Sequence, residues 1–232
     1  VTAGTADSPV DFTETNTGVL FARSAYTTFD TLAFGSVSLY ASQKTTNMNI
    51  GVLSGVCLLG GNVLSGVTFG TVDVQIPATM NGYSYGLAAA NISGAGSRID
   101  SVSVTNSYTL TLSGYSANKN QNNNKPRYIG GLFGTVAATV TLTDASVNNL
   151  HANIDAYEAL AKDGSFGGIG GLVDTNVSNC TVTGKIVGPV GGGDLGRAMV
   201  GGISGAPSSG NKTYKNCHFT GELDGAIVGG II

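Results

Sequence analysis

The sequence predicts an all-β protein, a single-domain β-solenoid similar to a parallel β-helix, with about six coils of roughly 35 residues and two insertions. Two observations predict this fold. A strand-like phrase recurs six times along the 232 residues, and a glycine-rich phrase precedes every copy. Phrases that recur at a fixed period are typical of stacked architectures, in which each copy buries its apolar face against the next copy.

The strand phrase is clearest in "VSNCTVTGKIV" from Val177 and "YKNCHFTGEL" from Tyr214. Its six copies begin 35, 35, 43, 35 and 37 residues apart. Apolar side chains alternate along each copy, as in a strand with one buried face. Alignment of the copies places six residues in one column, which we expect to form a core stack: Leu32, Val67, Val102, Ala145, Cys180 and Cys217.

Two of the three cysteines fall in that column. Because the other members are apolar, we favour buried thiols that pack as small hydrophobic side chains. A disulfide between adjacent coils stays open, since stacked strands lie about 4.8 Å apart, within the range of bridged Cα atoms. His218 directly follows Cys217 and would point to the opposite face of the strand, so we expect no metal site.

The glycine-rich phrase supplies the corner before each strand. We expect its glycines to adopt positive φ and to turn the chain where neighbouring coils lie close together. The phrase begins at Gly18, Gly51, Tyr85, Gly130, Gly170 and Gly201. A seventh copy, "GGII", begins at Gly229.

The phrases "GGLFG", "GGLVD" and "GGISG", followed by "NCTVTG", resemble the GLUG-repeat family of microbial surface and secreted proteins. The resemblance covers residues 130–232 well and residues 18–130 loosely. It implies a β-solenoid, in agreement with the repeat period.

These repeats divide the chain into three parts: a leader or cap strand at 1–17, solenoid repeats at 18–228, and a truncated half-repeat at 229–232. The chain begins with Val1 rather than Met, as a mature product does after removal of a leader. Together with the resemblance, this predicts a secreted or cell-surface protein.

Two insertions interrupt the repeat period. The first, "YSANKNQNNNKPRY" from Tyr115, has no apolar rhythm and is expected to project as a loop. The second contains "NIDAYEALAKDG", in which Asp155 can cap a short helix that Gly164 ends. Insertions often cluster on the binding face of a solenoid, although loops without a role are equally compatible. The candidate ligand contacts are Tyr115, Asn122, Asn123, Lys125, Arg127 and Tyr128.

Composition argues against several classes of function. A net charge of −3 with no basic stripe argues against nucleic-acid binding. The uncharged stretch 51–70 has the length of a membrane span, but its six glycines and its place in the repeat favour buried strands, so we expect no membrane insertion. The 14 acidic residues and two histidines form no catalytic spacing, and no cofactor motif occurs. We therefore expect a protein that is neither an enzyme nor a cofactor binder.

The remaining feature is the rod itself, which would expose unpaired strand edges at both ends. We expect the leader and the apolar half-repeat to complete each other between copies, as in donor-strand pairing. The candidate assembly residues are Val10, Phe12, Ile227, Val228, Ile231 and Ile232. The sequence thus favours a structural or adhesive element of a cell-surface filament, with itself or other surface proteins as partners.

Two alternatives stay open. The first is a solenoid that binds or cleaves glycans, with acidic residues such as Asp73, Asp100 and Asp144 in one column, or with tyrosines that stack on sugars: Tyr83, Tyr85, Tyr115 and Tyr128. The second is an ice-binding surface. It would use short alternations of threonine and serine: Thr181 with Thr183, Ser103 with Thr105, and Thr139 with Thr141 and Thr143.

Overall fold

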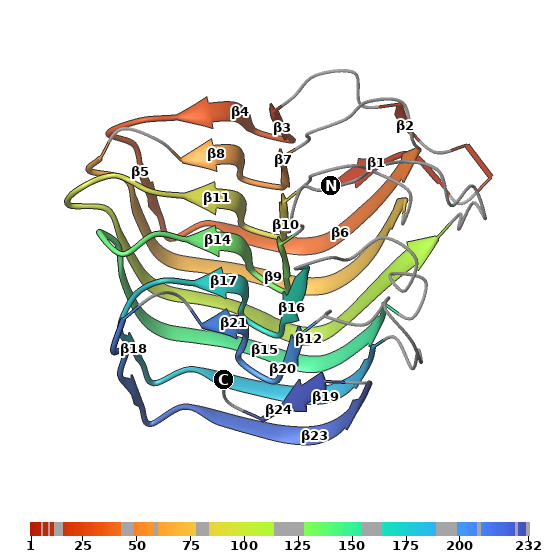
Figure 1. Ribbon diagram of the computed structural model, residues 1–232. Coiled ribbons are helices and arrows are strands. Elements are labelled where there is room, and N and C mark those ends of the chain that lie inside the picture. Colours follow the sequence, from red (N-terminus) through yellow and green to blue (C-terminus); the bar gives the residue numbers. More distant parts are fainter. Residues whose placement is uncertain are drawn as a thin grey trace, which may run out of the picture.

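The computed structural model describes residues 1–5, 7–8, 10–11, 16–42, 49–57, 60–77, 84–113, 128–154, 164–188, 199–207, 210–225 and 227–230. Within these ranges every regular element is a β-strand, and the strands stack as coils of a solenoid (Figure 1). Strands of successive coils pair in parallel. The β-solenoid expected from the repeats is therefore confirmed.

The described strands form three sheets, and each coil adds to all three in the same order. The short sheet contains β3 (Asn16–Gly18), β7 (Asn49–Gly51), β10 (Ser84–Gly86), β13 (Tyr128–Gly130), β16 (Ser165–Gly167), β20 (Met199–Gly201) and β24 (Ile227–Gly229). The middle sheet contains β4 (Phe21–Ser24), β8 (Ser54–Cys57), β11 (Ala89–Ile92), β14 (Phe133–Val136), β17 (Gly170–Val173) and β21 (Ser204–Pro207).

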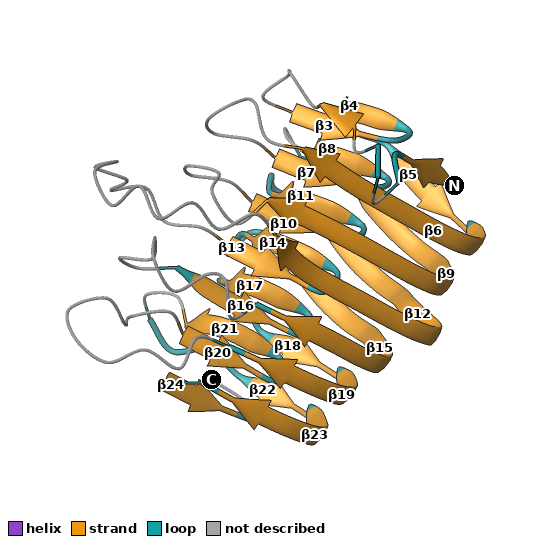
Figure 2. Cartoon of the chain, turned by 90° about the vertical axis from the view of Figure 1, so that its right-hand side faces the viewer, coloured by secondary structure: helices purple, strands orange, loops and turns teal. Residues whose placement is uncertain are grey.

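The long sheet forms one broad face of the solenoid, with its principal strands side by side (Figure 2). These are β6 (Ala33–Ser42), β9 (Val63–Pro77), β12 (Arg98–Ser113), β15 (Thr141–Asn153), β19 (Thr181–Val187) and β23 (His218–Asp224). Shorter strands complete it: β1 (Thr2–Ala3), β2 (Val10–Asp11), β5 (Thr28–Asp30), β18 (Val177–Ser178) and β22 (Tyr214–Lys215).

The corner between the short and middle sheets explains the glycine-rich phrase, but not through positive φ as expected. None of the first glycines of the phrase has a positive φ. Instead, a Cβ added to Gly130 would lie 1.8 Å from the carbonyl oxygen of Phe133 and 2.7 Å from the Cα atom of Gly170. The phrase therefore holds glycine because the chain turns tightly against itself and against the next coil.

The expected position of this phrase is wrong in the third and fifth coils. In the third coil Gly86, not Tyr85, pairs with Gly130, so the expected start is one residue early. Gly167 pairs with Gly130 on one side and with Gly201 on the other, whereas Gly170 pairs with Phe133 in the middle sheet. The corner is thus at Gly167, three residues before the expected start. The stretch "GGIGG" from Gly167 offers two glycine pairs, and only the pairing with neighbouring coils selects the first pair.

A second corner lies within the long sheet, where one residue of each coil adopts a left-handed backbone conformation. The residue immediately before each member of the expected core column has a φ between 52° and 63° in all six coils: Thr31, Gly66, Ser101, Asp144, Asn179 and Asn216. Asparagine and aspartate tolerate this conformation better than most residues. The side-chain amide of Asn216 donates to Oδ1 of Asn179 at 3.1 Å, and that of Asn179 donates to Oδ1 of Asp144 at 3.1 Å.

The expected core column lies in register inside the solenoid. Val102 pairs with Val67 and Ala145, and all three are fully buried. Cys180 is also fully buried, Cys217 is nearly so, and Leu32 is half-buried against the core. All three cysteines are free thiols, and burial raises the pKa of Cys180 to about 12.

The uncharged stretch 51–70 forms the end of β7, all of β8 and the first part of β9. It therefore folds as strands of the solenoid rather than as a helix. In the part of the chain that the structure describes, no helix is long and apolar enough to cross a membrane. The helix expected after Asp155 lies outside the described residues, and the predicted domain boundaries stay predictions.

Candidate functional site: the two end faces

The expected assembly residues belong to opposite ends of the solenoid. Val10 lies in β2, which pairs with the end of β6 in the first coil. Ile227 and Val228 lie in β24, which pairs with β20 beyond the sixth coil (Figure 1). Phe12, Ile231 and Ile232 lie outside the described residues.

The first coil exposes apolar side chains that the inner coils bury. Val19, Leu20 and Phe21 are 39%, 45% and 46% exposed. At the corresponding positions of the second coil, Val52, Leu53 and Ser54 are fully buried, and the same positions stay buried in the coils that follow. We call Val19, Leu20 and Phe21, with the outer edge of β4, the first-coil face.

Strands β1 and β2 cover only the long sheet of the first coil. Thr2 and Ala3 pair with Ser38 and Leu39, so that Leu39 is already buried in this coil. No described strand covers β4 in the same way. Among the described residues, the first-coil face is therefore covered by strands over part of the long sheet and by none over the middle sheet.

The opposite end shows the complementary arrangement. Val228 is 46% exposed, although Val200 and Phe166 in the same column are buried. Phe219 and Leu223 of β23 are half-buried, whereas their neighbours Val182 and Ile186 in β19 are fully buried. We call Val228, Phe219 and Leu223, with the free edges of β21, β23 and β24, the last-coil face.

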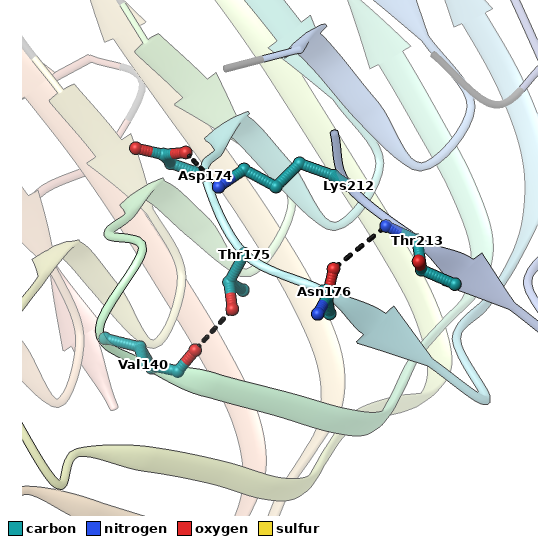
Figure 3. Close-up of polar contacts among 6 residues, drawn as sticks. All are labelled: Val140, Asp174, Thr175, Asn176, Lys212 and Thr213. Atoms are coloured by element: carbon teal, nitrogen blue, oxygen red, sulfur yellow. Dashed lines mark hydrogen bonds and ion pairs between the residues drawn. The ribbon is translucent and has the colours of Figure 1, made fainter. Parts of the chain in front are cut away.

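Polar contacts join the last coil to the coil before it, and that coil to the one preceding it, at the corner between the middle and long sheets (Figure 3). The Lys212 ammonium lies 2.8 Å from the Asp174 carboxylate, and the backbone N–H of Thr213 donates to Oδ1 of Asn176 at 2.9 Å. The buried hydroxyl of Thr175 donates to the carbonyl of Val140 at 2.6 Å. The last coil, which forms the last-coil face, is therefore held to the preceding coil by polar contacts as well as by apolar packing.

A shallow groove lies on the outer surface of the long sheet, near the ends of β12, β15 and β19. Its volume is about 170 Å³, and it is lined by Thr109, Thr111, His151, Ala152, Asn153, Lys185 and Val187. Lys185 forms an exposed ion pair with Glu222 at 2.7 Å, and the hydrogen bond to Glu222 raises the pKa of Lys185. The lining residues include hydroxyl, imidazole and amide groups, but the surface exposed in the groove is mainly apolar, a combination that is usual in sites for small molecules.

The expected ligand contacts are only partly described. Tyr115, Asn122, Asn123, Lys125 and Arg127 lie outside the described residues, as does Tyr83, while Tyr128 is half-buried in β13. Tyr85 is fully buried, and its hydroxyl lies 2.6 Å from that of Tyr108. Tyr85 is therefore a core residue and is excluded from stacking on a sugar.

The three aspartates considered as an acidic column do not share one. Asp73 pairs with Ser38 and Thr109 and accepts a hydrogen bond from the Tyr40 hydroxyl. Asp100 pairs in a different column, and Asp144 occupies the left-handed corner. Among the described residues, no group of three or more histidine, cysteine or acidic side chains is placed to hold a metal ion.

The threonine alternations do not form a uniform surface. Thr139 lies in a turn before β15 rather than in a strand. The outward column that contains Ser103 and Thr181 also contains Ala33, Thr68, Ser146 and His218. Side chains of this mixed size and polarity give an irregular face.

Comparison of the chain with protein families, with curated proteins and with solved structures gave no match. The resemblance to the GLUG-repeat family therefore stays a prediction. Of the residues that form the first-coil face, sequence reasoning missed Val19, Leu20 and Phe21. The available signal was that these apolar residues belong to the first of the recognised repeats.

Proposed function

We propose that the chain is a structural and adhesive β-solenoid of a cell-surface fibre, in which copies stack end to end. The observation that carries this proposal is the exposure, at both ends, of positions that the inner coils bury. Burying apolar surface contributes about 25 cal/mol per Å², so covering these side chains favours association.

The free strand edges support the same function. The outer edges of β4 and β21 have no strand partner among the described residues, so their backbone N–H and C=O groups can pair with another strand. Natural solenoids usually cover such edges with a polar cap. At the first-coil face, the outer edge of β4, without a described strand partner, lies beside Leu20 and Phe21, which is a surface suited to pairing with another coil.

Support for a place at the cell surface comes from the sequence. Only 11% of the residues are charged, and the GLUG-like phrases resemble repeats of microbial surface and secreted proteins. The three buried thiols are compatible with either an oxidising or a reducing compartment.

The proposal is tested by sedimentation velocity and negative-stain electron microscopy over a range of protein concentrations. We expect the chain to form filaments that lengthen with concentration. Leu20→Lys and Val228→Lys each place a charge on one end face and should give monomers. Thr71→Lys, on the exposed surface of the long sheet, is the matched control and should still form filaments. Monomers of the unmodified chain at every concentration would contradict the proposal.

The outer groove favours glycan binding as a second candidate function. Thr109 and Thr111 present hydroxyls beside Asn153, next to the point where the first insertion begins. Neutral oligosaccharides should bind in a glycan array, and Thr109→Val with Thr111→Val should abolish binding while Thr71→Val does not. The absence of binding to any glycan would remove this candidate. Ice binding, which no specific contact favours, would be detected as thermal hysteresis.

A further inference from the structure

Tyr26 lies in the turn from β4 into β5, at the lateral edge of the solenoid (Figure 1). The residue is 77% exposed, more than any other large apolar or aromatic residue of the described chain. The other tyrosines that the structure describes are buried or half-buried: Tyr40, Tyr85, Tyr108, Tyr128 and Tyr214. The ring of Tyr26 therefore contributes little to the core and is open to solvent.

The backbone of Tyr26 is left-handed, with a φ of 51°. A bulky side chain adopts this conformation only at an energetic cost. Tyr26 donates its backbone N–H to Gly60 at 3.2 Å, and Gly61 donates in the same way to Ala95 at 3.0 Å, so the equivalents of Tyr26 are Gly61 and Gly96. Their φ values are 62° and 77°. Because glycine fits this corner without strain, the fold does not explain the tyrosine.

The exposure of this corner does not depend on the place of a coil in the stack. Gly96 belongs to the third coil, which has described coils on both sides, and it is exposed. The Tyr26 ring leans toward the second coil, since a Cβ atom added to Gly61 would lie 3.0 Å from its Cδ1 atom and 3.7 Å from its Cε1 atom. The ring thus lies on the side wall of the solenoid rather than on an end face.

We propose that Tyr26 is a platform on which a sugar ring of a glycan stacks. Residues held in a costly backbone conformation cluster at ligand sites. The C–H face of a pyranose ring is apolar and its rim carries hydroxyl groups, which matches the apolar body and polar tip of a tyrosine. The platform lies outside both end faces and outside the outer groove, so it depends on neither of the functions proposed above.

The surroundings of Tyr26 favour a glycan over a protein as the partner. Protein interfaces are centred on a cluster of desolvated anchors, surrounded by contacts that exclude water. At this corner the neighbours of Tyr26 are small or hydroxyl-bearing: Ala25 and Thr27 flank it along the chain, and Gly61 lies beside its ring. A single ring among such residues is enough to stack one sugar but offers a protein little apolar surface.

Polar side chains near the platform can orient the glycan. Thr28 is exposed at the start of β5, and Arg98 is exposed in the same outward column, two coils away. Because adjacent strands lie about 4.8 Å apart, the Cα atoms of Thr28 and Arg98 are separated by about 10 Å. A sugar on Tyr26 would bond to the Thr28 hydroxyl, and a following sugar would accept from the Arg98 guanidinium. We therefore expect a ligand longer than one sugar ring, extended along the solenoid axis.

The test measures the binding of three neutral trisaccharides, built from glucose, mannose or N-acetylglucosamine, by titration with saturation-transfer difference NMR. We expect at least one of them to bind the unmodified chain. Tyr26→Phe keeps the ring and should bind the same trisaccharide. Tyr26→Gly and Tyr26→Asn remove the ring and should each weaken binding by about tenfold or more.

The two variants without a ring also guard against a loss of binding through misfolding. Glycine occupies the equivalent corners at Gly61 and Gly96, and asparagine tolerates a left-handed backbone. We expect neither variant to lower the midpoint of thermal unfolding, because the strain is relieved and little buried surface is lost. A lower midpoint in both variants would show that the fold itself needs the ring, and it would overturn the argument from strain.

Thr109→Val combined with Thr111→Val, at the outer groove, is the control for position and should leave this binding unchanged. Binding that is lost in the groove variant but kept in Tyr26→Gly would overturn the platform and support the groove as the glycan site. Binding of no trisaccharide to the unmodified chain would also overturn it. If Tyr26→Gly then abolished filaments, Tyr26 would contact another copy of the chain instead of a glycan.

Discussion

At the scale of single residues, the solenoid combines an apolar core with one buried polar pair. Tyr85 of β10 and Tyr108 of β12 are fully buried, and their hydroxyls lie 2.6 Å apart. Each hydroxyl is the hydrogen-bond partner of the other, so the pair links the short sheet to the long sheet through the interior. Burial raises the pKa of both tyrosines above the ordinary value of 10.0.

Replacing one member of this pair should cost more than replacing both. Tyr108→Phe leaves the Tyr85 hydroxyl buried without its partner, and we expect the free energy of unfolding to fall by about 1–3 kcal/mol. Adding Tyr85→Phe removes the orphaned hydroxyl and should recover part of the loss. Urea denaturation measures both effects, with Tyr26→Phe as a control at an exposed position. An equal loss in the free energy of unfolding for Tyr108→Phe and for the double variant would contradict this account.

The buried thiol of Cys180 predicts a loss of stability in alkali. Its pKa is about 12 in the folded chain and 9.0 when exposed, so the unfolded state loses its proton first as the pH rises. Stability is fully present below about pH 9 and falls by about 1.4 kcal/mol per pH unit up to about pH 12 through this group alone. The buried tyrosines add a further loss above about pH 10.

Cys180→Ala should reduce this slope between pH 9 and pH 10, where the tyrosines contribute least. Alanine already occupies the same column at position 145, so the fold should accept it. The comparison is urea unfolding at pH 7, 9, 10 and 11 for both chains. The same slope in both chains would show that Cys180 does not cause the loss.

At the scale of elements, each coil turns through two corners of different chemistry. The corner between the short and middle sheets requires glycine because neighbouring backbones lie close together. The corner within the long sheet requires a left-handed residue, which is supplied by Asn179, Asn216 or their equivalents. The hydrogen-bonded ladder of amide side chains then joins successive coils at this second corner.

Two glycine substitutions distinguish the effect of close backbone packing from the effect of replacing any glycine. Gly130→Ala places a Cβ within 1.8 Å of the Phe133 carbonyl oxygen, and we expect it to cost about 3 kcal/mol or more, or to prevent folding. An added Cβ at Gly35 has no heavy atom within 4 Å, so Gly35→Ala should be neutral or stabilise by about 0.5 kcal/mol. Thermal unfolding monitored by circular dichroism compares the two. Similar losses in both variants would contradict this explanation.

At the scale of the whole molecule, the solenoid is a one-dimensional stack in which the described strands cover the outer sides of the end coils only in part. Its inner coils bury the positions that Leu20, Phe21 and Val228 expose at the ends. Stability should therefore depend on whether the ends are covered. End-to-end stacking would turn both end coils into inner coils of a longer rod.

Stacking predicts a midpoint of thermal unfolding that rises with protein concentration, because association stabilises the folded chain by mass action. Calorimetry at several concentrations should show this rise for the unmodified chain and for Thr71→Lys. Leu20→Lys should remove it and leave a constant midpoint. A midpoint independent of concentration in the unmodified chain would argue against stacking.

The sequence by itself determined the repeat, the place of a long strand after each glycine corner and the core column from Leu32 to Cys217. It could do so because a fixed period and alternating apolar residues are local properties that every coil repeats. The glycine phrase was recognised as a corner for the same reason, although its cause and its position in the third and fifth coils were not.

Only the tertiary structure decided which glycine pair of "GGIGG" turns the corner, which residues adopt left-handed φ, and that Tyr85 lies inside the core. Each depends on the distance to an atom of another coil, and a one-dimensional pattern does not contain that distance. The end faces show the same limit. Val19 and Leu20 have the same apolar character as Val52 and Leu53, and they differ only because no described strand of the chain lies over them.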